Sequence, residues 1–223
     1  MANREIELLD WGLTDYDEAY ARQEELFSRT IADKKESKPT HNYLILCEHP
    51  HVYTLGKSGK PANMLMTDEY LAARGIKFVH TDRGGDITYH GPGQIVGYPI
   101  FDLDNFRLGL KDYIDRMEEA VIRTIARYGL RGARLHGATG VWLDPETPGR
   151  QRKICAIGVR SSRFVTMHGF ALNVNTDLSY FHNINPCGFI DKGVCSIASE
   201  TGRHIDFAEA KRFVAEEFNN VFR

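Results

Sequence analysis

Residues 83–99 constrain the fold of this chain most strongly, because five glycines and two prolines stand within this short stretch. Glycine loses more conformational freedom on folding than any other residue, so such frequent use indicates a backbone that turns sharply or approaches another group closely. Hydrogen-bonding side chains, including Arg83, Thr88 and His90, are interleaved with the glycines. The pattern fits a ligand-holding loop or an ordinary turn between strands. Its spacing matches neither a Walker loop nor a dinucleotide-binding fingerprint.

The composition of the 223-residue chain excludes several classes of function. A formal net charge of −2 gives no reason to expect nucleic acid or an anionic membrane as a partner. Charged residues stand within the first ten positions and no apolar run approaches membrane-spanning length, so neither a signal peptide nor a membrane helix is expected. The four cysteines form no Cys-x-x-Cys pair. We therefore expect a reduced, cytoplasmic protein with one domain.

Hydrophobic spacing predicts strands and helices in no strict alternation. Helices are expected to begin at Thr14, with a capping box to Asp17, at Thr67, at Lys111 and at Asp206. Residues 177–193 are predicted as a loop because Pro186, Gly188 and Gly193 interrupt any regular element there. The expected strands are residues 4–9, 43–47, 52–55, 76–81, 95–101, 140–143, 153–159 and 169–174. This mixture favours an α/β or α+β fold with mixed sheets flanked by helices.

The glycine-rich block resembles the signature of the lipoyl(octanoyl) transferase family. Three further stretches are similar to that family, in its order: residues 48–56, 153–158 and 168–188. The resemblance implies a biotin/lipoate protein ligase-like fold, with residues 1–223 as a single catalytic domain. It also implies transfer of an octanoyl group from octanoyl-acyl carrier protein to a lysine of a lipoyl domain, the first step of endogenous protein lipoylation. The implied acceptors are the lipoyl domains of 2-oxoacid dehydrogenase E2 subunits and the glycine cleavage H protein.

Three cysteines compete for the role of nucleophile on the residues alone. Cys155 lies in a predicted strand, on the same face as Lys153, and Cys195 is favoured as a structural thiol beside an apolar run. Cys187 stands between a proline and a glycine in a loop, and residues 185–188 are similar to the acyl-carrying cysteine site of the family, which implies Cys187. Many family members have Val-Thr-Ser where this chain has Val194-Cys195-Ser196, which adds a second thiol near the site.

Lys153 begins an apolar strand at the position that matches the active-site lysine of the family. A solvated surface lysine is the ordinary alternative. The resemblance implies that Lys153 lowers the pKa of Cys187 and later takes a proton from the attacking lysine, which requires a partly neutral Lys153. An acyl-cysteine divides the transfer into two steps, and aminolysis of a thioester runs downhill. No cofactor, ATP or metal is therefore expected.

The resemblance also implies the wall of an acyl pocket. The expected wall residues are Arg83, Gly84, Gly85, Asp86, Ile87, Thr88, Tyr89, His90, Ala156, Ile157, Gly158, His168, Gly169, Phe170 and Ala171. Small residues at four of these positions suit a straight alkyl chain, whose burial is worth roughly 5 kcal/mol. His168 is a possible partner for the substrate carbonyl or for Lys153, although a satisfied core histidine is the commoner case. Glu48, His49 and His51 lack a third ligand at a recognisable spacing, so no metal site is predicted.

Two other functions remain open on the sequence. An ATP-dependent lipoate or biotin protein ligase has the same fold, but it needs no nucleophilic thiol, so Cys187 speaks against it. A non-catalytic protein that binds lipoyl domains is less economical, because Lys153 and Cys187 are both present. Basic side chains could meet an acidic carrier protein, although a solvated surface is the default for each. These are Arg22, Lys34, Lys35, Lys38, Arg150, Arg152, Arg160 and Arg163.

Overall fold

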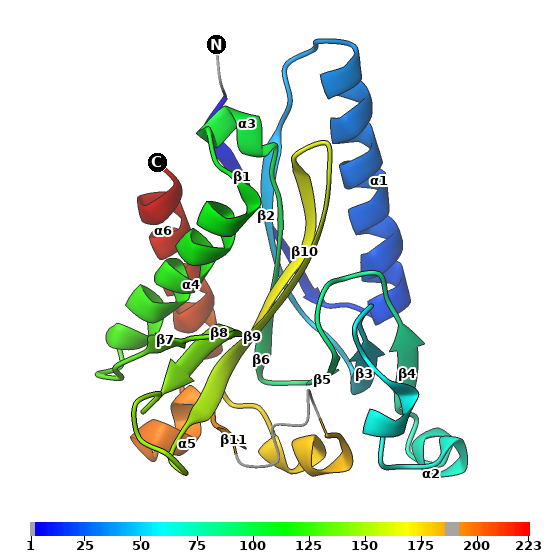
Figure 1. Cartoon of the computed structure of the whole chain (residues 1–223), viewed down its shortest axis with the longest axis vertical. Coiled ribbons are helices and arrows are strands. Elements are labelled where there is room, and N and C mark those ends of the chain that lie inside the picture. The colour runs from blue at the N-terminus through cyan, green and yellow to red at the C-terminus, as the bar shows by residue number, and fades with distance from the viewer. Residues whose placement is uncertain (1–2, 186–191) are drawn as a thin grey trace.

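A mixed sheet forms the centre of the molecule in a computed structural model that describes residues 3–185 and 192–223 (Figure 1). Its strand order is β1-β2-β6-β10-β9-β8-β7, and β11 pairs with β9. The β1–β2 and β11–β9 pairs are parallel and the others are antiparallel. The bounds are β1 (Ile6–Leu13), β2 (Asn42–Glu48), β6 (Gln94–Ile100), β7 (Ala133–Leu135), β8 (Ala138–Leu143), β9 (Arg152–Ser162), β10 (Val165–Asn173) and β11 (Gly193–Val194). The predicted mixed α/β architecture is confirmed.

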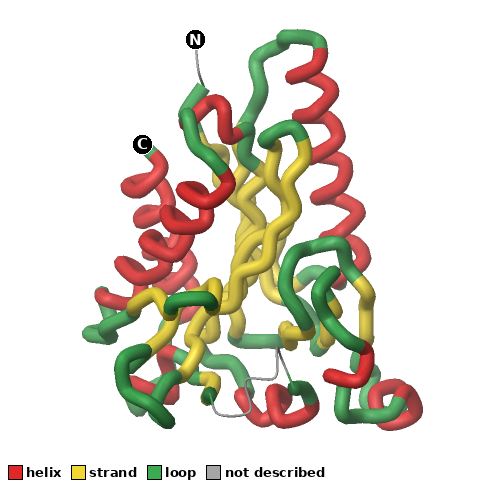
Figure 2. The backbone as a smooth tube through the Cα atoms, in the orientation of Figure 1, coloured by secondary structure: helices red, strands yellow, loops and turns green. Residues whose placement is uncertain are grey.

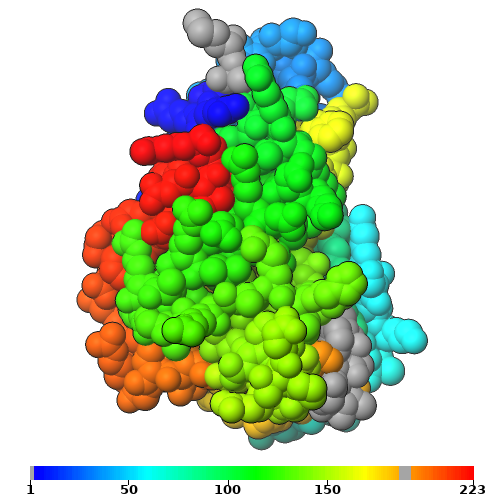
Figure 3. Space-filling model, turned by 60° about the vertical axis from the view of Figure 1, so that its left-hand side comes forward, coloured from blue at the N-terminus to red at the C-terminus, as the bar shows by residue number. Residues whose placement is uncertain are grey.

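Helices cover both faces of this sheet, as Figures 1 and 2 show. Helix α1 (Tyr16–Lys35) packs on one face, and α4 (Leu110–Ala126) and α6 (Phe207–Phe222) lie side by side on the other (Figure 3). The apolar stripe predicted for α4 is confirmed, because Met117, Val121 and Ile125 are fully buried. None of the helices within the described ranges combines the length and apolar character needed to cross a membrane.

A smaller sheet lies beside the large one, with strand order β4-β3-β5. Its strands are β3 (Val52–Leu55), β4 (Lys77–His80) and β5 (Ile87–His90). The short helices η1 (Pro61–Asn63) and α2 (Asp68–Ala72) connect β3 to β4, and η2 (Leu178–Asn183), from a distant part of the chain, packs against β5. The chain leaves the large sheet after β2, where Pro50 interrupts the ladder, so β3 pairs elsewhere. Strand β5 was not predicted, because glycines flank its four residues.

Other short elements also differ from the sequence prediction. The N-cap of α1 is Asp15, whose carboxylate accepts a hydrogen bond from the Asp17 backbone N–H, whereas the Thr14 hydroxyl donates to the Trp11 carbonyl. The predicted cap of α6 is confirmed, since Asp206 accepts from the Glu209 backbone N–H at 3.1 Å. Helices α3 (Leu103–Phe106) and α5 (Ile197–Thr201) were not predicted. Both are short, so hydrophobic periodicity gives little signal for them.

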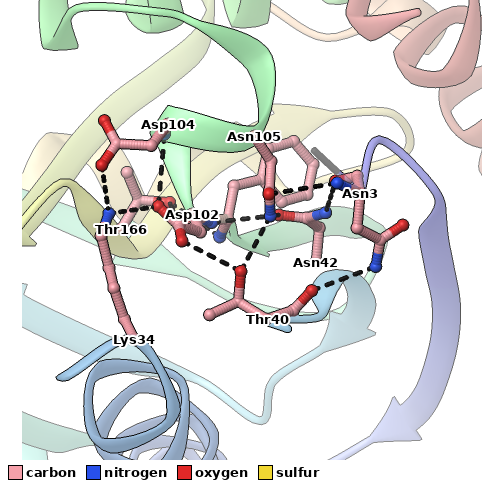
Figure 4. Close-up of polar contacts among 9 residues, drawn as sticks. Asn3, Lys34, Thr40, Asn42, Asp102, Asp104, Asn105 and Thr166 are labelled. Carbon is pink, nitrogen blue, oxygen red and sulfur yellow. Dashed lines mark hydrogen bonds and ion pairs between the residues drawn. The ribbon is translucent and has the colours of Figure 1, made fainter. Parts of the chain in front are cut away.

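A buried polar cluster ties α3 to the end of α1 and to β2 (Figure 4). We call it the α3 cluster and define it as Lys34, Thr40, Asn42, Asp102 and Asn105. Asp102 is 4 % exposed and accepts hydrogen bonds from the Lys34 ammonium and from the Thr40 hydroxyl. Asn42 accepts from the Asp102 backbone N–H at 3.0 Å, and Asn105 donates to Thr40 at 2.9 Å. Within the described residues, none of the cluster's buried side-chain polar atoms lacks a hydrogen-bond partner.

Candidate active site

A cavity of about 410 Å³ lies where the large sheet meets the glycine-rich block. Strands β6, β9 and β10 border it, and so do most of residues 83–90 of the glycine-rich block and residues 192–194. Most of the predicted wall residues line this cavity. They are Arg83, Gly85, Asp86, Ile87, Thr88, His90, Ala156, Ile157, Gly158, His168, Gly169, Phe170 and Ala171, together with Lys153.

The strand register gives the cavity a direction. In the β9–β10 ladder Ala156 pairs with Ala171 and Gly158 pairs with Gly169, and all four residues border the cavity. Five residue steps separate Lys153 from Gly158 along β9, which corresponds to about 17 Å in a strand. The cavity is therefore a slot that follows the strands. We call its two ends the Lys153 end and the His168 end.

Glycines allow the glycine-rich block to lie directly against β9. A Cβ atom on Gly158 would stand 2.6 Å from the Gly84 carbonyl oxygen, and one on Gly56 would stand 2.4 Å from the Gly85 carbonyl oxygen. The Gly84 N–H donates to the Val159 carbonyl at 2.9 Å. One wall of the slot is therefore fixed by backbone contacts that any larger side chain would push apart.

Arg83 fixes the same wall from the side of the small sheet. It is 8 % exposed, and its guanidinium donates to the Thr54 carbonyl oxygen at 2.8 Å and to the Thr54 hydroxyl at 2.9 Å. Hydrogen bonds from a charged donor are stronger than those between neutral groups. Arg83 therefore holds the beginning of the block on β3.

Two of the predicted wall residues do not border the cavity. The Gly84 carbonyl faces Gly158, so this residue supports the wall from behind. The Tyr89 ring packs inside the small sheet, stacked on Tyr180 with ring centroids 4.8 Å apart, and its hydroxyl is 2.7 Å from His51 Nδ1. The structure therefore does not place these two residues on the cavity wall where they were expected. The resemblance matched an unbroken run, whereas packing takes some of its residues away from the slot.

His90 borders the slot with both ring nitrogens in hydrogen bonds. Its Nδ1 is 2.8 Å from Gln94 Oε1, which only accepts, so Nδ1 carries the proton. Its Nε2 is 3.3 Å from the Thr54 hydroxyl. Burial lowers the pKa of His90 to about 3, so the ring is neutral at pH 7. His90 is thus a satisfied core histidine that also serves as pocket wall.

His168 differs from His90 in backbone and in hydrogen bonding. Its φ of +62° lies in the left-handed region, which costs a non-glycine residue on the order of 1–3 kcal/mol. Its Nε2 is 2.8 Å from an Asp82 oxygen, and Asp82 also pairs with Arg160 at 2.6 Å. Burial lowers the pKa of His168 to about 4 despite the opposing effect of Asp82. The ring is therefore neutral at pH 7, with the proton on Nε2 and a lone pair on Nδ1.

The register also separates His168 from Lys153. His168 pairs with Val159, six residue steps along β9 from Lys153, or about 20 Å. A partnership between His168 and Lys153 was one of the two possibilities raised by the sequence, and the structure contradicts it. The spacing of these residues in the sequence gave no sign of this, because the hairpin register alone decides which residues of β9 and β10 meet.

Lys153 stands at the other end of the slot. Its Nζ donates to the Thr139 carbonyl at 3.2 Å and lies 4.7 Å from the centroid of the Trp142 ring.

The β8–β9 register shifts between Val141 and Trp142, which leaves one extra residue on β9. Cys155 is consequently in the main core rather than beside Lys153, so the predicted shared face is wrong. The bulge that causes this cannot be recognised from period-two alternation.

The predicted nucleophile, Cys187, lies outside the described residues. The three described cysteines, Cys47, Cys155 and Cys195, are all buried, and desolvation raises the pKa of each thiol, to about 12 for Cys47. A buried thiol with a raised pKa is a poor nucleophile at neutral pH. None of these three competes with Cys187, and Cys195 is packed as a structural thiol.

Glu48, His49 and His51 point to separate partners. The Glu48 carboxylate accepts from the Gly93 N–H, His49 lies between the Thr14 carbonyl and the Tyr98 hydroxyl, and His51 contacts Tyr89. No group of three or more His, Cys, Asp or Glu side chains in residues 3–185 and 192–223 could hold a metal ion.

Sequence reasoning missed several residues that border the slot. Gln94 and Tyr98 belong to the glycine-rich block, and Asn173 is the last residue of the motif that contains His168. All three could have been predicted if every polar residue of these motifs had been considered. Tyr16 and Trp142 carry no such signal, because they come from distant parts of the chain. The others are Val96, Gly137, Ala138, Thr139, Phe181, Lys192, Gly193 and Val194. Several basic residues suggested for a carrier surface, among them Arg152 and Arg160, form ion pairs within the molecule.

Comparison with known families and proteins gives a consistent result. Residues 15–219 match the model of the lipoyl protein ligase A/B catalytic domain. An octanoyltransferase of Parabacteroides distasonis is 58 % identical over 213 residues, which cover 96 % of each chain. An octanoyltransferase of Bacteroides fragilis is 59 % identical over 208 residues, covering 93 % of this chain and 94 % of the relative.

Solved structures share the fold at much lower identity. A bipartite lipoate protein ligase from Thermoplasma acidophilum has a TM-score of 0.71 at 15 % identity, covering 97 % of this chain and 83 % of that one. A lipoate-protein ligase A bound with ATP has a TM-score of 0.70 at 16 % identity, covering 97 % and 84 %. A biotin protein ligase from Aquifex aeolicus has a TM-score of 0.55 at 11 % identity, covering 99 % and 71 %. The predicted biotin/lipoate ligase-like fold is confirmed.

Proposed function

This chain belongs to the lipoyl protein ligase A/B family, among its octanoyltransferases, and we propose that it moves the octanoyl group through a thioester on Cys187 with the help of Lys153. The chain is an acyltransferase of protein lipoylation. The donor in this proposal is octanoyl-acyl carrier protein. The acceptors are the lipoyl domains of 2-oxoacid dehydrogenase E2 subunits and the glycine cleavage H protein.

The observation that carries the proposal is the position of Lys153 at one end of a slot lined by small and apolar groups. Ala156, Ile157, Gly158 and Ala171 border the part of the slot beyond it. A straight alkyl chain buried there gains roughly 5 kcal/mol. Lys192 also borders the slot, and only five residue steps separate it from Cys187 in the sequence. The proposal places the Cys187 sulfur at the Lys153 end.

The chemistry needs a thiolate and then a base. In the first step the Cys187 thiolate attacks the carbonyl carbon of the donor thioester, the bond from that carbon to the carrier sulfur breaks, and the carrier leaves as a thiolate that takes a proton from solvent. In the second step the acceptor amine attacks the acyl-cysteine and the Cys187 thiolate leaves. The Lys153 ammonium stabilises the thiolate, and its neutral form takes the proton that the amine loses. The first step exchanges one thioester for another and the second exchanges a thioester for an amide, so neither step needs ATP.

An intact mass measurement tests this proposal. Incubation of the chain with octanoyl-acyl carrier protein should add one octanoyl group, and the adduct should disappear when a lipoyl domain is added. Cys187→Ala should show no adduct and no transfer, while Cys195→Ala, its matched control, should keep both. An adduct that survives in Cys187→Ala, or transfer that requires ATP, would contradict the proposal.

Lys153→Arg separates the two roles given to Lys153. The variant keeps the positive charge, but arginine does not release its proton at accessible pH. We expect the adduct to form while its transfer to the lipoyl domain slows by about 100-fold, within the range for loss of a general base. Equal slowing of both steps would show that Lys153 acts through its shape or charge alone.

A further inference from the structure

Strand β9 changes its pairing partner close to Lys153. Its antiparallel ladder with β10 ends where Cys155 pairs with Leu172. Strand β11 then pairs with β9 in parallel, with Val194 opposite Lys153. Because β8 pairs with the other edge of β9, β11 continues along the edge that β10 has left. A strand of two residues supplies few hydrogen bonds of its own, so other contacts are needed to hold it there.

The side chain of Asn173, the last residue of β10, supplies one of these contacts. Its Nδ2 donates to the Cys195 backbone carbonyl at 3.0 Å, and the Cys195 N–H donates to the Lys153 carbonyl at 3.0 Å. Asn173 is 4 % exposed and Cys195 is 2 % exposed. A buried backbone carbonyl is costly to leave without a hydrogen bond, so loss of the Asn173 amide would weaken the attachment of residues 193–195.

The Asn173 amide is itself held in one orientation. Its Oδ1 accepts from Gln94 Nε2 at 2.9 Å, and Gln94 is the residue that pairs with Asn173 on β6. Gln94 Nε2 also donates to the Tyr89 carbonyl at 3.1 Å, and its Oε1 accepts from His90. Each of the two amides therefore donates to a backbone carbonyl, which only accepts, so the oxygen and nitrogen of neither amide can be exchanged.

This chain of hydrogen bonds joins β6, β10 and the residues after β11 at the Lys153 end of the slot, and both Gln94 and Asn173 border the slot. We propose that Asn173 is a positioning residue for octanoyl transfer, which holds residues 193–195 against the start of β9 and thereby fixes the Lys153 end of the slot. The inference rests on the proposed function, in which Lys153 acts on Cys187, six residues before Gly193 in the sequence.

The reactivity of Cys187 provides the test. The chain is treated with iodoacetamide at a series of pH values, and intact mass counts the labels on each molecule. The folded parent should take one label, because its other three thiols are buried. The pH midpoint should lie below the value of about 8.5 for a free cysteine. Unfolded molecules take four labels, so folded molecules are distinguished even when a variant is partly unfolded.

Asn173→Leu removes the amide at nearly constant volume. Because the Lys153 ammonium is then placed less favourably for the Cys187 thiolate, we expect the pH midpoint to rise by about one unit. The kcat for octanoyl transfer to a lipoyl domain should fall by on the order of 10- to 100-fold, while KM for the octanoyl carrier stays within about threefold. Asn173→Ser, whose side chain is too short to reach the Cys195 carbonyl, should change the pH midpoint and kcat in the same direction.

Asp102→Ala is the matched control. It removes hydrogen bonds from the α3 cluster and so lowers stability, and Asp102 does not border the slot. Both the pH midpoint and kcat should keep their parental values in this variant. A raised midpoint in Asp102→Ala would show that the shift reports lost stability, and it would overturn the inference.

The outcomes separate this inference from the proposed function. A parental pH midpoint in both Asn173 variants would overturn the positioning role, whatever their stability, and so would a parental kcat. A parent enzyme that forms no octanoyl adduct, or whose Cys187 titrates like a free cysteine, would overturn the proposed function instead.

Discussion

The α3 cluster and the His168 end of the slot are both buried and polar, yet they differ in how they use their hydrogen bonds. In the α3 cluster the Asp102 carboxylate accepts from Lys34 and Thr40, and none of the cluster's described, buried side-chain polar atoms is left over. At the His168 end, the His168 Nδ1 atom has no hydrogen-bond partner in the described part of the chain. The backbone is also left-handed at His168.

This difference indicates different tasks. A fully paired cluster holds segments together, here the end of α1, β2 and α3, and its loss should affect stability alone. A wall with spare polar atoms costs stability and is retained where a ligand completes it. The following experiments separate the two regions by asking whether each change affects stability, activity or both.

Blocking the slot should have the largest effect on activity. Ala156→Phe places a large ring between β9 and β10 where Ala156 and Ala171 meet. Because the acyl chain could no longer reach its reactive position, kcat/KM for octanoyl transfer should fall by about 100-fold or more. The folded fraction, checked by circular dichroism, should change little. Ala72→Phe on the exposed side of α2 is the matched control and should retain activity.

Removing a hydrogen-bond acceptor from the α3 cluster should lower stability and leave activity unchanged. Asp102→Ala removes the acceptor of the Lys34 ammonium and the Thr40 hydroxyl, so the free energy of unfolding in urea should fall by about 3 kcal/mol. Asp104 also pairs with Lys34 but its side chain is 63 % exposed, so Asp104→Ala should cost less than about 1 kcal/mol. Both variants should keep the parental kcat/KM for every acyl thioester. A changed acyl preference in Asp102→Ala would break the distinction between the two regions.

The pH dependence of stability should show a smaller difference. His168 and His90 have pKa values lowered to about 4 and about 3, against an ordinary value near 6.5. Below pH 6.5 the unfolded chain binds a proton at each histidine and the folded chain does not, so stability falls as the pH is lowered towards 4. Each histidine contributes a slope of up to about 1.4 kcal/mol per pH unit.

Replacing the titrating group checks this slope. His168→Asn should reduce the slope between pH 6.5 and pH 4.5 by nearly one proton, measured by urea unfolding at a series of pH values. Ala72→Phe, which alters no titratable group, should leave the slope in this window unchanged. An unchanged slope in His168→Asn would mean that its ring is protonated in the folded protein.

The sequence predicted the architecture well and the details of the site unevenly. Long elements such as α4 and β2 carry strong periodic or continuous hydrophobic signals, and both were found. The bulge that moves Cys155 away from Lys153 and the register that places His168 opposite Val159 depend on pairing between distant segments. Local patterns contain no information of that kind. The motif match did identify about half of the residues that border the slot.

Gln23 shows a different limit of sequence reasoning. It lies on a helix that the sequence predicted, at a position where a glutamine is usually solvent-exposed, yet it is fully buried beneath His168. Its importance becomes visible only when the hydrogen bonds of the folded chain are counted.

The central claim is that the acyl chain lies along β9 with its reacting carbon at the Lys153 end and its tail extending towards the His168 end. Photo-crosslinking with an octanoyl thioester that carries a diazirine on its last carbon tests this directly, with the labelled residues identified by peptide mass spectrometry. The account predicts labels on residues that border the slot beyond Lys153, such as Ile157 of β9 and Ala171 of β10. Labels confined to Thr139, Trp142 and the rest of β8 would place the tail at the Lys153 end and contradict it.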